Sequence, residues 1–521
     1  MEVQGKNLIG FSESSEGTVG IQAINPTSGE PIGPLFFKAT ESELDLAVRK
    51  AHAAFSIYRK KTGQEKALFL ETIASEIEAL GDILIERYIS ESGLPQGRAI
   101  GERGRTIGQL RLFAELLKEG SWVNAIIDTA QPERQPLPKV DLRAMEMSLG
   151  PVGIFGASNF PLAFSVAGGD TTSALAAGCC VVFKGHASHL GTSELVGKAI
   201  LAAAKKTNMP DGVFSLVFDD ATTIGQSLVK HPLIKAIGFT GSFKGGKSIF
   251  DTAAARPEPI PVYAEMGSIN PVFILPKTLN EKGESLAQAY MNSVTMGVGQ
   301  FCTNPGLLVI ENNKSFEETL KTVSTASTGG VMLNKGIQSV YHKGVEDFQK
   351  YAKVISFGKK TEGHTAAQPV LFSADYQTFK ETELLQEEVF GPSSLVVTCS
   401  SKEEMLEVAR TMSGHLTATV FGSEEELLEN SDLLDLLEQK VGRLIINGFP
   451  TGVEVTHAMV HGGPYPSTTD SRSTSVGTMA ITRFTRPICF QDMPNVLLPN
   501  ELKNDNPLGI WRKLNGKIGQ K

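Results

Sequence analysis

The chain has 521 residues, 41% hydrophobic and 20% charged, which is ordinary for a globular protein with large buried cores. At about 150 residues per domain, this length predicts two to four domains. The formal net charge of −8 argues against a nucleic-acid partner, and the lack of any long apolar run argues against a membrane span or a secretory signal.

Five cysteines are spread thinly along the chain and show no metal-ligand spacing. Cys179 and Cys180 lie in an apolar run and are interpreted as small core residues, whereas Cys302 lies in a glycine-rich segment. We therefore expect a cytoplasmic protein in a reducing compartment, with no bound metal and with one catalytic thiol as an open possibility.

The first predicted elements are helices, within residues 40–118. Thr40 and Glu43 have the spacing of a capping box, with Thr40 as the N-cap, and apolar residues follow at helical spacing. Further helical blocks are predicted at 65–80 and 98–117.

From about residue 150 the chain alternates between strands and helices. Predicted strands are 152–155, 179–183, 213–218 and 234–239, and predicted helices are 164–177, 192–206 and 224–230. The second half continues with strands at 272–275, 307–310, 394–397, 417–421 and 443–447. This order indicates βαβ units and parallel sheets, so the predicted fold class is α/β with a second α/β domain. The polar, proline-containing segment 121–143 is predicted to leave the main body.

Two of these strands end in residues that suit a phosphate-bearing ligand. The turn Gly238-Phe239-Thr240-Gly241-Ser242 leads into a predicted helix, whose free N–H groups and N-terminal hydroxyl can bind phosphate. Lys184 follows another buried strand and would point into the crevice where parallel sheets bind dinucleotides. An ordinary strand-to-helix turn and a solvated lysine remain the alternatives.

Three further residues could carry covalent chemistry. Cys302 follows the glycine-flanked run 297–301, which allows a substrate to approach closely, and its N–H could help to hold an oxyanion. Glu265 lies in an apolar setting that is expected to raise its pKa and to suit it as a general base. Asn159 could offer a side-chain amide to the oxyanion. A buried structural cysteine and a salt-bridged structural glutamate remain the alternatives.

In this order, the motifs resemble the aldehyde dehydrogenase family over nearly the whole chain. The matching residues are Asn25-Pro26-Thr27-Ser28-Gly29-Glu30, Asn159-Phe160-Pro161, Lys184, Phe239-Thr240-Gly241-Ser242, Glu265, Gly299-Gln300-Phe301-Cys302 and Glu388-Val389-Phe390-Gly391-Pro392. The segments 259–271, 299–306, 461–467 and 475–478 resemble the α-ketoglutarate semialdehyde (2,5-dioxopentanoate) dehydrogenase branch. That branch is itself similar to some NADP-dependent long-chain aldehyde dehydrogenases.

The resemblance implies three structural parts. A Rossmann-type dinucleotide-binding domain would comprise residues 1–120 and 144–262, and a catalytic α/β domain residues 263–460. A small oligomerisation element would comprise 121–143 and 475–500. The resemblance also implies a homodimer or a homotetramer.

The same resemblance implies a mechanism. Cys302 attacks the aldehyde carbon, the Asn159 amide and the Cys302 N–H hold the oxyanion, and Glu265 activates the water that hydrolyses the thioester. The residues implied for cofactor binding are Lys184, Gly225, Phe239, Gly241, Ser242, Glu388 and Phe390, and Phe160 is the one implied for substrate binding.

One departure from the family pattern bears on the cofactor. Many NAD-preferring relatives carry a glutamate three residues beyond the lysine, where it binds the adenosine ribose hydroxyls, and here that position is Ala187. A carboxylate would repel a 2′-phosphate, so its absence favours NADP. We expect NADP to be the preferred cofactor and NAD to be the alternative.

The narrower resemblance implies the small-molecule substrate 2,5-dioxopentanoate, oxidised to 2-oxoglutarate. Its distal carboxylate requires a cation, for which the candidates are Arg103, Arg105, Arg111 and Arg472, with a solvated surface arginine as the alternative for each. A medium- or long-chain fatty aldehyde dehydrogenase is the alternative function. An acylating enzyme generally lacks the hydrolytic glutamate, and a non-catalytic relative would have lost Cys302.

Overall fold

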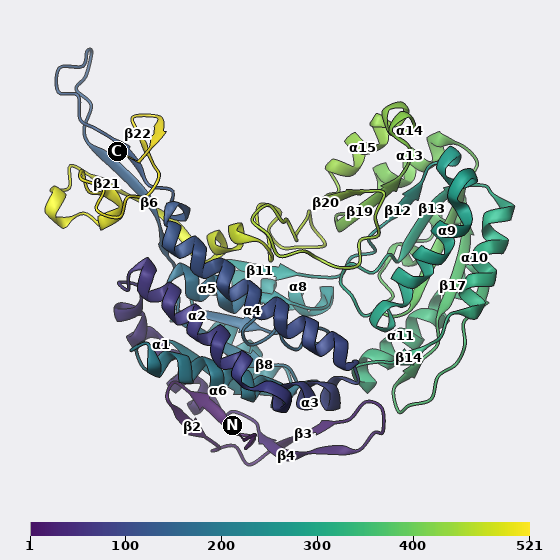
Figure 1. The fold of residues 1–521 in the computed structure, drawn as a ribbon, viewed down its shortest axis with the longest axis horizontal. Coiled ribbons are helices and arrows are strands. Elements are labelled where there is room, and N and C mark those ends of the chain that lie inside the picture. Colours follow the sequence, from purple (N-terminus) through teal and green to yellow (C-terminus); the bar gives the residue numbers. More distant parts are fainter. Residues whose placement is uncertain (1, 521) are drawn as a thin grey trace.

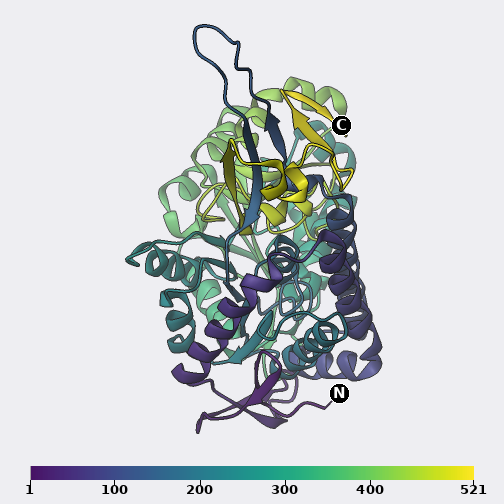
Figure 2. The same ribbon diagram turned by 90° about the vertical axis from the view of Figure 1, so that its left-hand side faces the viewer.

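The computed structural model describes residues 2–520, so Met1, which the domain prediction includes, lies outside the described residues. Figure 1 shows two α/β bodies side by side, and both Figure 1 and Figure 2 show a narrow arm that projects from the first body. None of the helices within residues 2–520 is long and apolar enough to cross a membrane.

The first helix of the chain begins where its predicted cap places it. The helix α1 (Glu41–Tyr58) begins after Thr40, whose side chain accepts the N–H of Glu43 while the Glu43 side chain returns to Thr40, so the predicted capping box is confirmed. The other helices of this region are α2 (Gly63–Ala79), α3 (Gly81–Ser92) and α4 (Gln96–Glu119), of which α3 was not predicted.

The first body is built on a sheet with the strand order β11-β10-β7-β8-β9-β1-β2, and β7 to β11 run parallel. Its strands are β1 (Asn7–Ile9), β2 (Ser12–Ser14), β7 (Val152–Phe155), β8 (Val181–Gly185), β9 (Phe214–Phe218), β10 (Ala236–Thr240) and β11 (Val262–Glu265). The connecting helices are α5 (Gly169–Ala177), α6 (Leu190–Lys206), α7 (Thr223–Lys230) and α8 (Phe243–Ala254). The predicted alternation of strands and helices is confirmed, and Cys179 and Cys180 are fully buried.

One helix of this body begins later than predicted. We expected a helix over 164–177, but α5 begins at Gly169. The buried carboxylate of Glu102 accepts the N–H groups of Leu162 and Ala163 at 2.8 and 2.9 Å, and these contacts hold the preceding segment in turns.

The second body repeats the arrangement, with the strand order β15-β17-β18-β13-β12-β19-β20. Its strands are β12 (Val272–Ile274), β13 (Leu307–Glu311), β15 (Lys353–Phe357), β17 (Val370–Asp375), β18 (Ser393–Cys399), β19 (His415–Phe421) and β20 (Val441–Ile446). Its helices are α9 (Pro276–Thr295), α10 (Lys314–Ala326), α11 (Lys335–Phe348), α12 (Tyr376–Glu381), α13 (Lys402–Thr411), α14 (Glu424–Glu429) and α15 (Ser431–Glu438). The second α/β domain is thereby confirmed, although β15 and β17 were not predicted.

The arm is a third sheet with the strand order β21-β6-β5-β22-β23. Its strands are β5 (Ile126–Asp128), β6 (Leu142–Ser148), β21 (Thr485–Gln491), β22 (Arg512–Leu514) and β23 (Lys517–Gly519). The loop between β5 and β6 extends far from the bodies, as expected for segment 121–143 (Figure 2). The tail beyond residue 500 also belongs to this sheet, because β22 pairs in parallel with β5.

Two short ribbons complete the described strands. The pair β3 (Gly20–Ile24) and β4 (Pro31–Phe37) lies at the base of the first body in Figure 1, and β14 (Gly330–Val331) pairs with β16 (Ala366–Ala367). The carboxyl ends of β7, β8, β10 and β11 meet at the edge of the first sheet that carries the site described next.

Candidate active site

One cleft collects most of the residues singled out from the sequence. It lies where the carboxyl ends of the first sheet face the second body. Nine of the predicted residues line it, namely Asn159, Lys184, Phe239, Gly241, Ser242, Glu265, Cys302, Glu388 and Phe390. The structure therefore brings the predicted nucleophile, base, oxyanion donor and dinucleotide contacts to one place.

Two predicted residues lie elsewhere. Gly225 is buried within α7, where a Cβ atom would lie 3.0 Å from the ring of Phe155. Phe160 lines a second cavity together with Phe301, the residue that precedes Cys302. Gly225 therefore packs α7 against the sheet, and Phe160 faces the space where a substrate chain could extend.

The backbone before Cys302 is unusual. Gly297, Val298 and Gly299 follow one another with φ of 56°, 61° and 67°, in the left-handed region. A β-branched residue is rarely found there, so Val298 marks local strain. At Gly299 a Cβ atom would lie 2.1 Å from the carbonyl oxygen of Gly391, so a glycine is required. On the other side of the nucleophile, the Asn270 amide donates to the Cys302 carbonyl at 2.9 Å.

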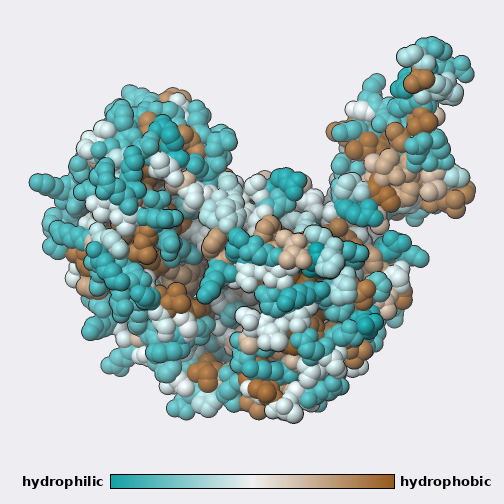
Figure 3. All heavy atoms as spheres, turned by 180° about the vertical axis from the view of Figure 1, so that it is seen from behind, coloured by the Kyte–Doolittle hydropathy of each residue, from teal (hydrophilic) through white to brown (hydrophobic). Residues whose placement is uncertain are grey.

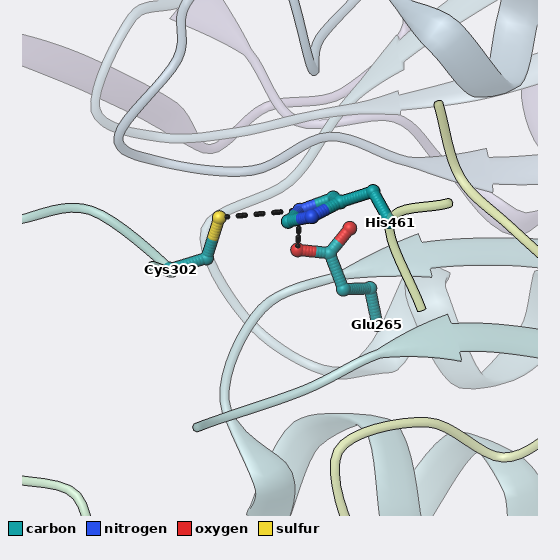
Figure 4. Close-up of side chains that lie close together, drawn as sticks. All are labelled: Glu265, Cys302 and His461. Atoms are coloured by element: carbon teal, nitrogen blue, oxygen red, sulfur yellow. Dashed lines mark hydrogen bonds and ion pairs between the residues drawn. The ribbon is translucent and has the colours of Figure 1, made fainter. Parts of the chain in front are cut away.

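A cysteine, a histidine and a glutamate meet in this cleft (Figure 4). The Sγ of Cys302 lies 3.4 Å from Nε2 of His461, and the same Nε2 lies 2.8 Å from Oε1 of Glu265. Sequence reasoning did not identify His461 as a site residue, although the segment that contains it contributed to the family resemblance. The imidazole thus stands between the thiol and the carboxylate.

A long loop brings His461 to this place by pairing with β11. Glu265 bridges to Thr468, and the N–H of Met266 donates to the carbonyl of Ser467 at 2.8 Å. The same loop carries Ser475, whose hydroxyl donates to Oε2 of Glu265 at 2.6 Å. Ser475 was also missed as a site residue. This one loop therefore supplies a hydrogen bond to Oε2 of Glu265 and an imidazole within ion-pair distance of Oε1.

These contacts shift the pKa of Glu265 in the direction opposite to the one that the sequence predicts. Burial raises the pKa of this carboxyl, but the positive charge that His461 carries when protonated, together with polar contacts with His461, Ser475 and Cys302, lowers it more, so that the pKa lies below its usual value. The prediction of a raised pKa was wrong because the sequence did not reveal these partners. Glu265 is therefore ionised and can accept a proton.

The pKa of the Cys302 thiol shifts in the opposite direction. Burial, followed by the negative charge of Glu265, holds the pKa of Cys302 well above its usual value, and Arg105 acts against this rise. The thiol is therefore protonated at neutral pH until a base removes its proton. Nε2 of His461 is placed to do so.

The sequence predicted no metal. Glu265, Cys302 and His461 nevertheless offer one potential metal-ligand atom each, within 4.8 Å of one another. The same atoms are the groups that a thiol-based reaction needs, as nucleophile and proton acceptors.

The other half of the cleft fits a dinucleotide. Ser242 is the N-cap of α8, where its hydroxyl accepts the N–H of Gly245 at 3.3 Å and the helix N-terminus faces the cleft. Burial lowers the pKa of Lys184 at the end of β8, although nearby Asp219 and Asp220 oppose this effect. The Glu388 carboxylate lies against Gly267, and burial raises its pKa to about 7. A phosphate site, a cation and a ribose-hydroxyl acceptor thus line one groove.

The residues for an oxyanion are also close together. The Asn159 amide donates to the carbonyl of Gln300 at 3.0 Å, which leaves its second N–H to face the cleft. Within residues 2–520 the backbone N–H of Cys302 donates to no other group. Both N–H groups can therefore donate hydrogen bonds to a negatively charged oxygen atom that forms next to Sγ.

Comparison with known proteins agrees with this chemistry. A model described as the aldehyde dehydrogenase family matches residues 11–486. Alpha-ketoglutaric semialdehyde dehydrogenase 2 of Azospirillum brasilense is 49% identical, covering 99% of this chain and 100% of that protein. Alpha-ketoglutaric semialdehyde dehydrogenase of Acinetobacter baylyi is 48% identical, covering 100% of this chain and 99% of that protein. The structure of a betaine aldehyde dehydrogenase from Staphylococcus aureus in complex with NAD⁺ has a TM-score of 0.81 at 19% identity, covering 94% of this chain and 95% of the other, which confirms the predicted fold.

Proposed function

This chain belongs to the aldehyde dehydrogenase family, and we propose that it oxidises 2,5-dioxopentanoate to 2-oxoglutarate with NADP or NAD as the acceptor. The contact of the Cys302 thiol with His461, next to the Glu265 carboxylate, carries the chemistry. The substrate is supported by the two full-length relatives, both named for the α-ketoglutaric semialdehyde.

The first half of the reaction uses the thiol and its neighbours. Nε2 of His461 accepts the thiol proton, and the resulting imidazolium is stabilised by the Glu265 carboxylate 2.8 Å away. Sγ bonds to the aldehyde carbon, and the oxygen takes up the negative charge between the amide of Asn159 and the N–H of Cys302. When bound, the dinucleotide accepts the hydride that converts this adduct to a thioester.

The second half uses the carboxylate. After the imidazolium has released its proton to solvent, Glu265 removes a proton from water. The hydroxide attacks the acyl carbon, the C–S bond breaks, and the product leaves as a carboxylate. Per turnover, one aldehyde and one water give one carboxylate, one hydride on the acceptor and two protons. Cys302 then regains its proton, and the site returns to the state shown in Figure 4.

The substrate assignment is tested by comparing kcat/KM for three aldehydes. We expect kcat/KM for 2,5-dioxopentanoate to exceed that for hexanal by roughly 10- to 100-fold, because charge-assisted hydrogen bonds to its carboxylate stabilise the bound substrate. The value for succinate semialdehyde should lie between the two. Each rate is followed by the absorbance of the reduced nicotinamide. Preference for hexanal would instead support a fatty aldehyde dehydrogenase and reject the proposed substrate.

The cofactor preference depends on Ala187. We propose that NADP is preferred, because no carboxylate at this position repels a 2′-phosphate, while Lys184 lies in the cleft to bind it. Ala187→Glu is expected to lower kcat/KM for NADP roughly tenfold, through like-charge repulsion at a partly screened site. Ala187→Gln is the uncharged control and should change the NADP-to-NAD ratio little. A wild-type protein that uses NAD a hundredfold better than NADP would contradict the proposal.

We further propose a cytoplasmic homodimer or homotetramer that assembles through the arm. The arm exposes apolar side chains that a lone chain would leave in water, including Leu137 at 69%, Val496 at 81% and Ile518 at 73% exposure. Figure 3 shows apolar residues gathered on this part of the molecule. The five cysteines are all unpaired, which supports a reducing compartment.

A further inference from the structure

A second cavity lies close to the site and is lined by chain neighbours of its residues. Phe160 and Phe301 line it, while their chain neighbours Asn159 and Cys302 line the cleft. A substrate whose aldehyde meets Cys302 can therefore extend past these rings. Three arginines also line the cavity, namely Arg98, Arg105 and Arg443.

Two of these arginines already have partners. Arg98 pairs with the Glu102 carboxylate at 3.3 Å and stacks on Phe160, with its guanidinium carbon 4.3 Å from the ring centre. Arg443 donates from Nη2 to the carbonyl oxygens of Pro450 and Gly452 at 2.9 and 3.1 Å. Of the buried nitrogens in these two side chains, only Nε of Arg443 lacks a hydrogen-bond partner in the described part of the chain.

Arg105 differs from both. Its Nε and Nη2 are buried and have no hydrogen-bond partner, and among the described residues it forms no ion pair. Its guanidinium carbon lies 5.1 Å and 5.9 Å from the ring centres of Phe164 and Phe160, and these rings hold it in place. Burial lowers the pKa of Arg105, while the charges of Cys302, Glu102 and Glu265 raise it.

The two unpartnered nitrogens have a specific geometry. Nε–H and one Nη2–H lie parallel on the same edge of a guanidinium, and this fork matches the two oxygens of a carboxylate. The nearby carboxylate of Glu102 is unavailable, because it accepts Arg98, the Tyr88 hydroxyl and two backbone N–H groups. Glu454, at the exposed rim, forms no ion pair within residues 2–520. A carboxylate from outside the protein could accept hydrogen bonds from both Nε and Nη2 of Arg105.

We propose that Arg105 binds the distal carboxylate of the substrate through Nε and Nη2, and so selects ω-oxo acids over uncharged aldehydes. The proposal rests on the proposed function, because it assigns the residue that recognises that substrate class. Of the four arginines that the sequence offered, the structure pairs three elsewhere. Arg103 donates to the Gly81 carbonyl at 3.1 Å, Arg111 pairs with Glu78, and Arg472 pairs with Asp470.

The test compares two five-carbon aldehydes, 2,5-dioxopentanoate and pentanal, in the full-length protein with saturating cofactor. Arg105→Met keeps a long side chain against the phenyl rings but removes the fork. We expect kcat/KM for 2,5-dioxopentanoate to fall roughly 10- to 100-fold, mainly through KM, and the value for pentanal to change far less. Arg105→Lys should recover part of the loss, because it keeps the charge without the fork. Arg103→Met, on the same helix but outside the cavity, should behave as the wild type.

The readout is the ratio of kcat/KM for the two substrates. Loss of the Arg105 charge also affects the Cys302 thiol, but this effect slows both reactions equally and leaves the ratio unchanged. An unchanged ratio in Arg105→Met and in Arg105→Gln, with a wild type that prefers 2,5-dioxopentanoate, would reject Arg105 as the anchor but leave the proposed function intact. If both rates also fell equally, Arg105 would have a structural role instead. A wild type that does not prefer 2,5-dioxopentanoate to pentanal would reject the proposed function itself.

Discussion

Replacement of Cys302 by alanine is expected to lower kcat by about 10⁴- to 10⁶-fold, the range seen when a covalent nucleophile is removed. The reason is geometric, since Cys302 supplies the one thiol that lies next to both His461 and Glu265. The variant should fold normally, because Cys302 is partly exposed in the cleft and a smaller side chain creates no clash. The measurement is the steady-state rate of nicotinamide reduction at saturating aldehyde and cofactor.

The matched control is Cys489→Ser, which changes the exposed cysteine on the arm strand β21 and should retain wild-type kcat. Circular dichroism of both variants would establish that they are folded. If Cys302→Ala kept more than a few per cent of the wild-type rate, the covalent mechanism would have to be abandoned.

Replacement of Glu265 by glutamine is expected to separate the two halves of the reaction. In thioester formation Glu265 only stabilises the imidazolium, and the thiol, His461, the oxyanion donors and the bound dinucleotide are still present in the variant. One equivalent of reduced nicotinamide per site should therefore appear in a burst. Hydrolysis then lacks its base, and the steady-state rate should fall roughly 10²- to 10⁴-fold. Stopped-flow absorbance measures both phases. An unchanged steady-state rate would remove Glu265 from the mechanism.

His461→Asn provides the contrast for Glu265→Gln. Because His461 accepts the thiol proton, this variant should slow the burst itself rather than the phase that follows it.

Alkylation of the Cys302 thiol by iodoacetamide gives an independent readout. The raised pKa of Cys302 means that modification speeds up as the pH rises, and removal of the Glu265 charge should lower this pKa and speed modification at a given pH. Slower modification in Glu265→Gln would contradict the proposed electrostatics.

The sequence was informative wherever a local pattern determines a local structure. The capping box at Thr40 requires residues only three positions apart, and the alternation of strands with helices between 152 and 239 follows from short apolar runs. Cys302 and Glu265 could be identified because each lies in a short motif of its own.

Contacts between distant segments could not be predicted in this way. His461 reaches Cys302 across 159 positions, and Ser475 reaches Glu265 across 210. Nothing near residue 265 reveals these partners, so burial alone gave the wrong direction for the pKa of Glu265. The turns before α5 also involve a distant partner, because the carboxylate of Glu102 that accepts the N–H of Leu162 lies 60 positions before it.

The position of the loop 461–475 also orders events during synthesis of the protein. A ribosome makes Cys302 long before it makes His461, so the growing chain carries a thiol without its base and with its neighbouring carboxylate unpaired. The nucleophile becomes competent only when the later segment pairs with β11 and brings the imidazole and the Ser475 hydroxyl to Glu265. What the nascent chain lacks is therefore the catalytic arrangement, because its unburied thiol has the ordinary pKa of a cysteine and gains its catalytic partners only on folding.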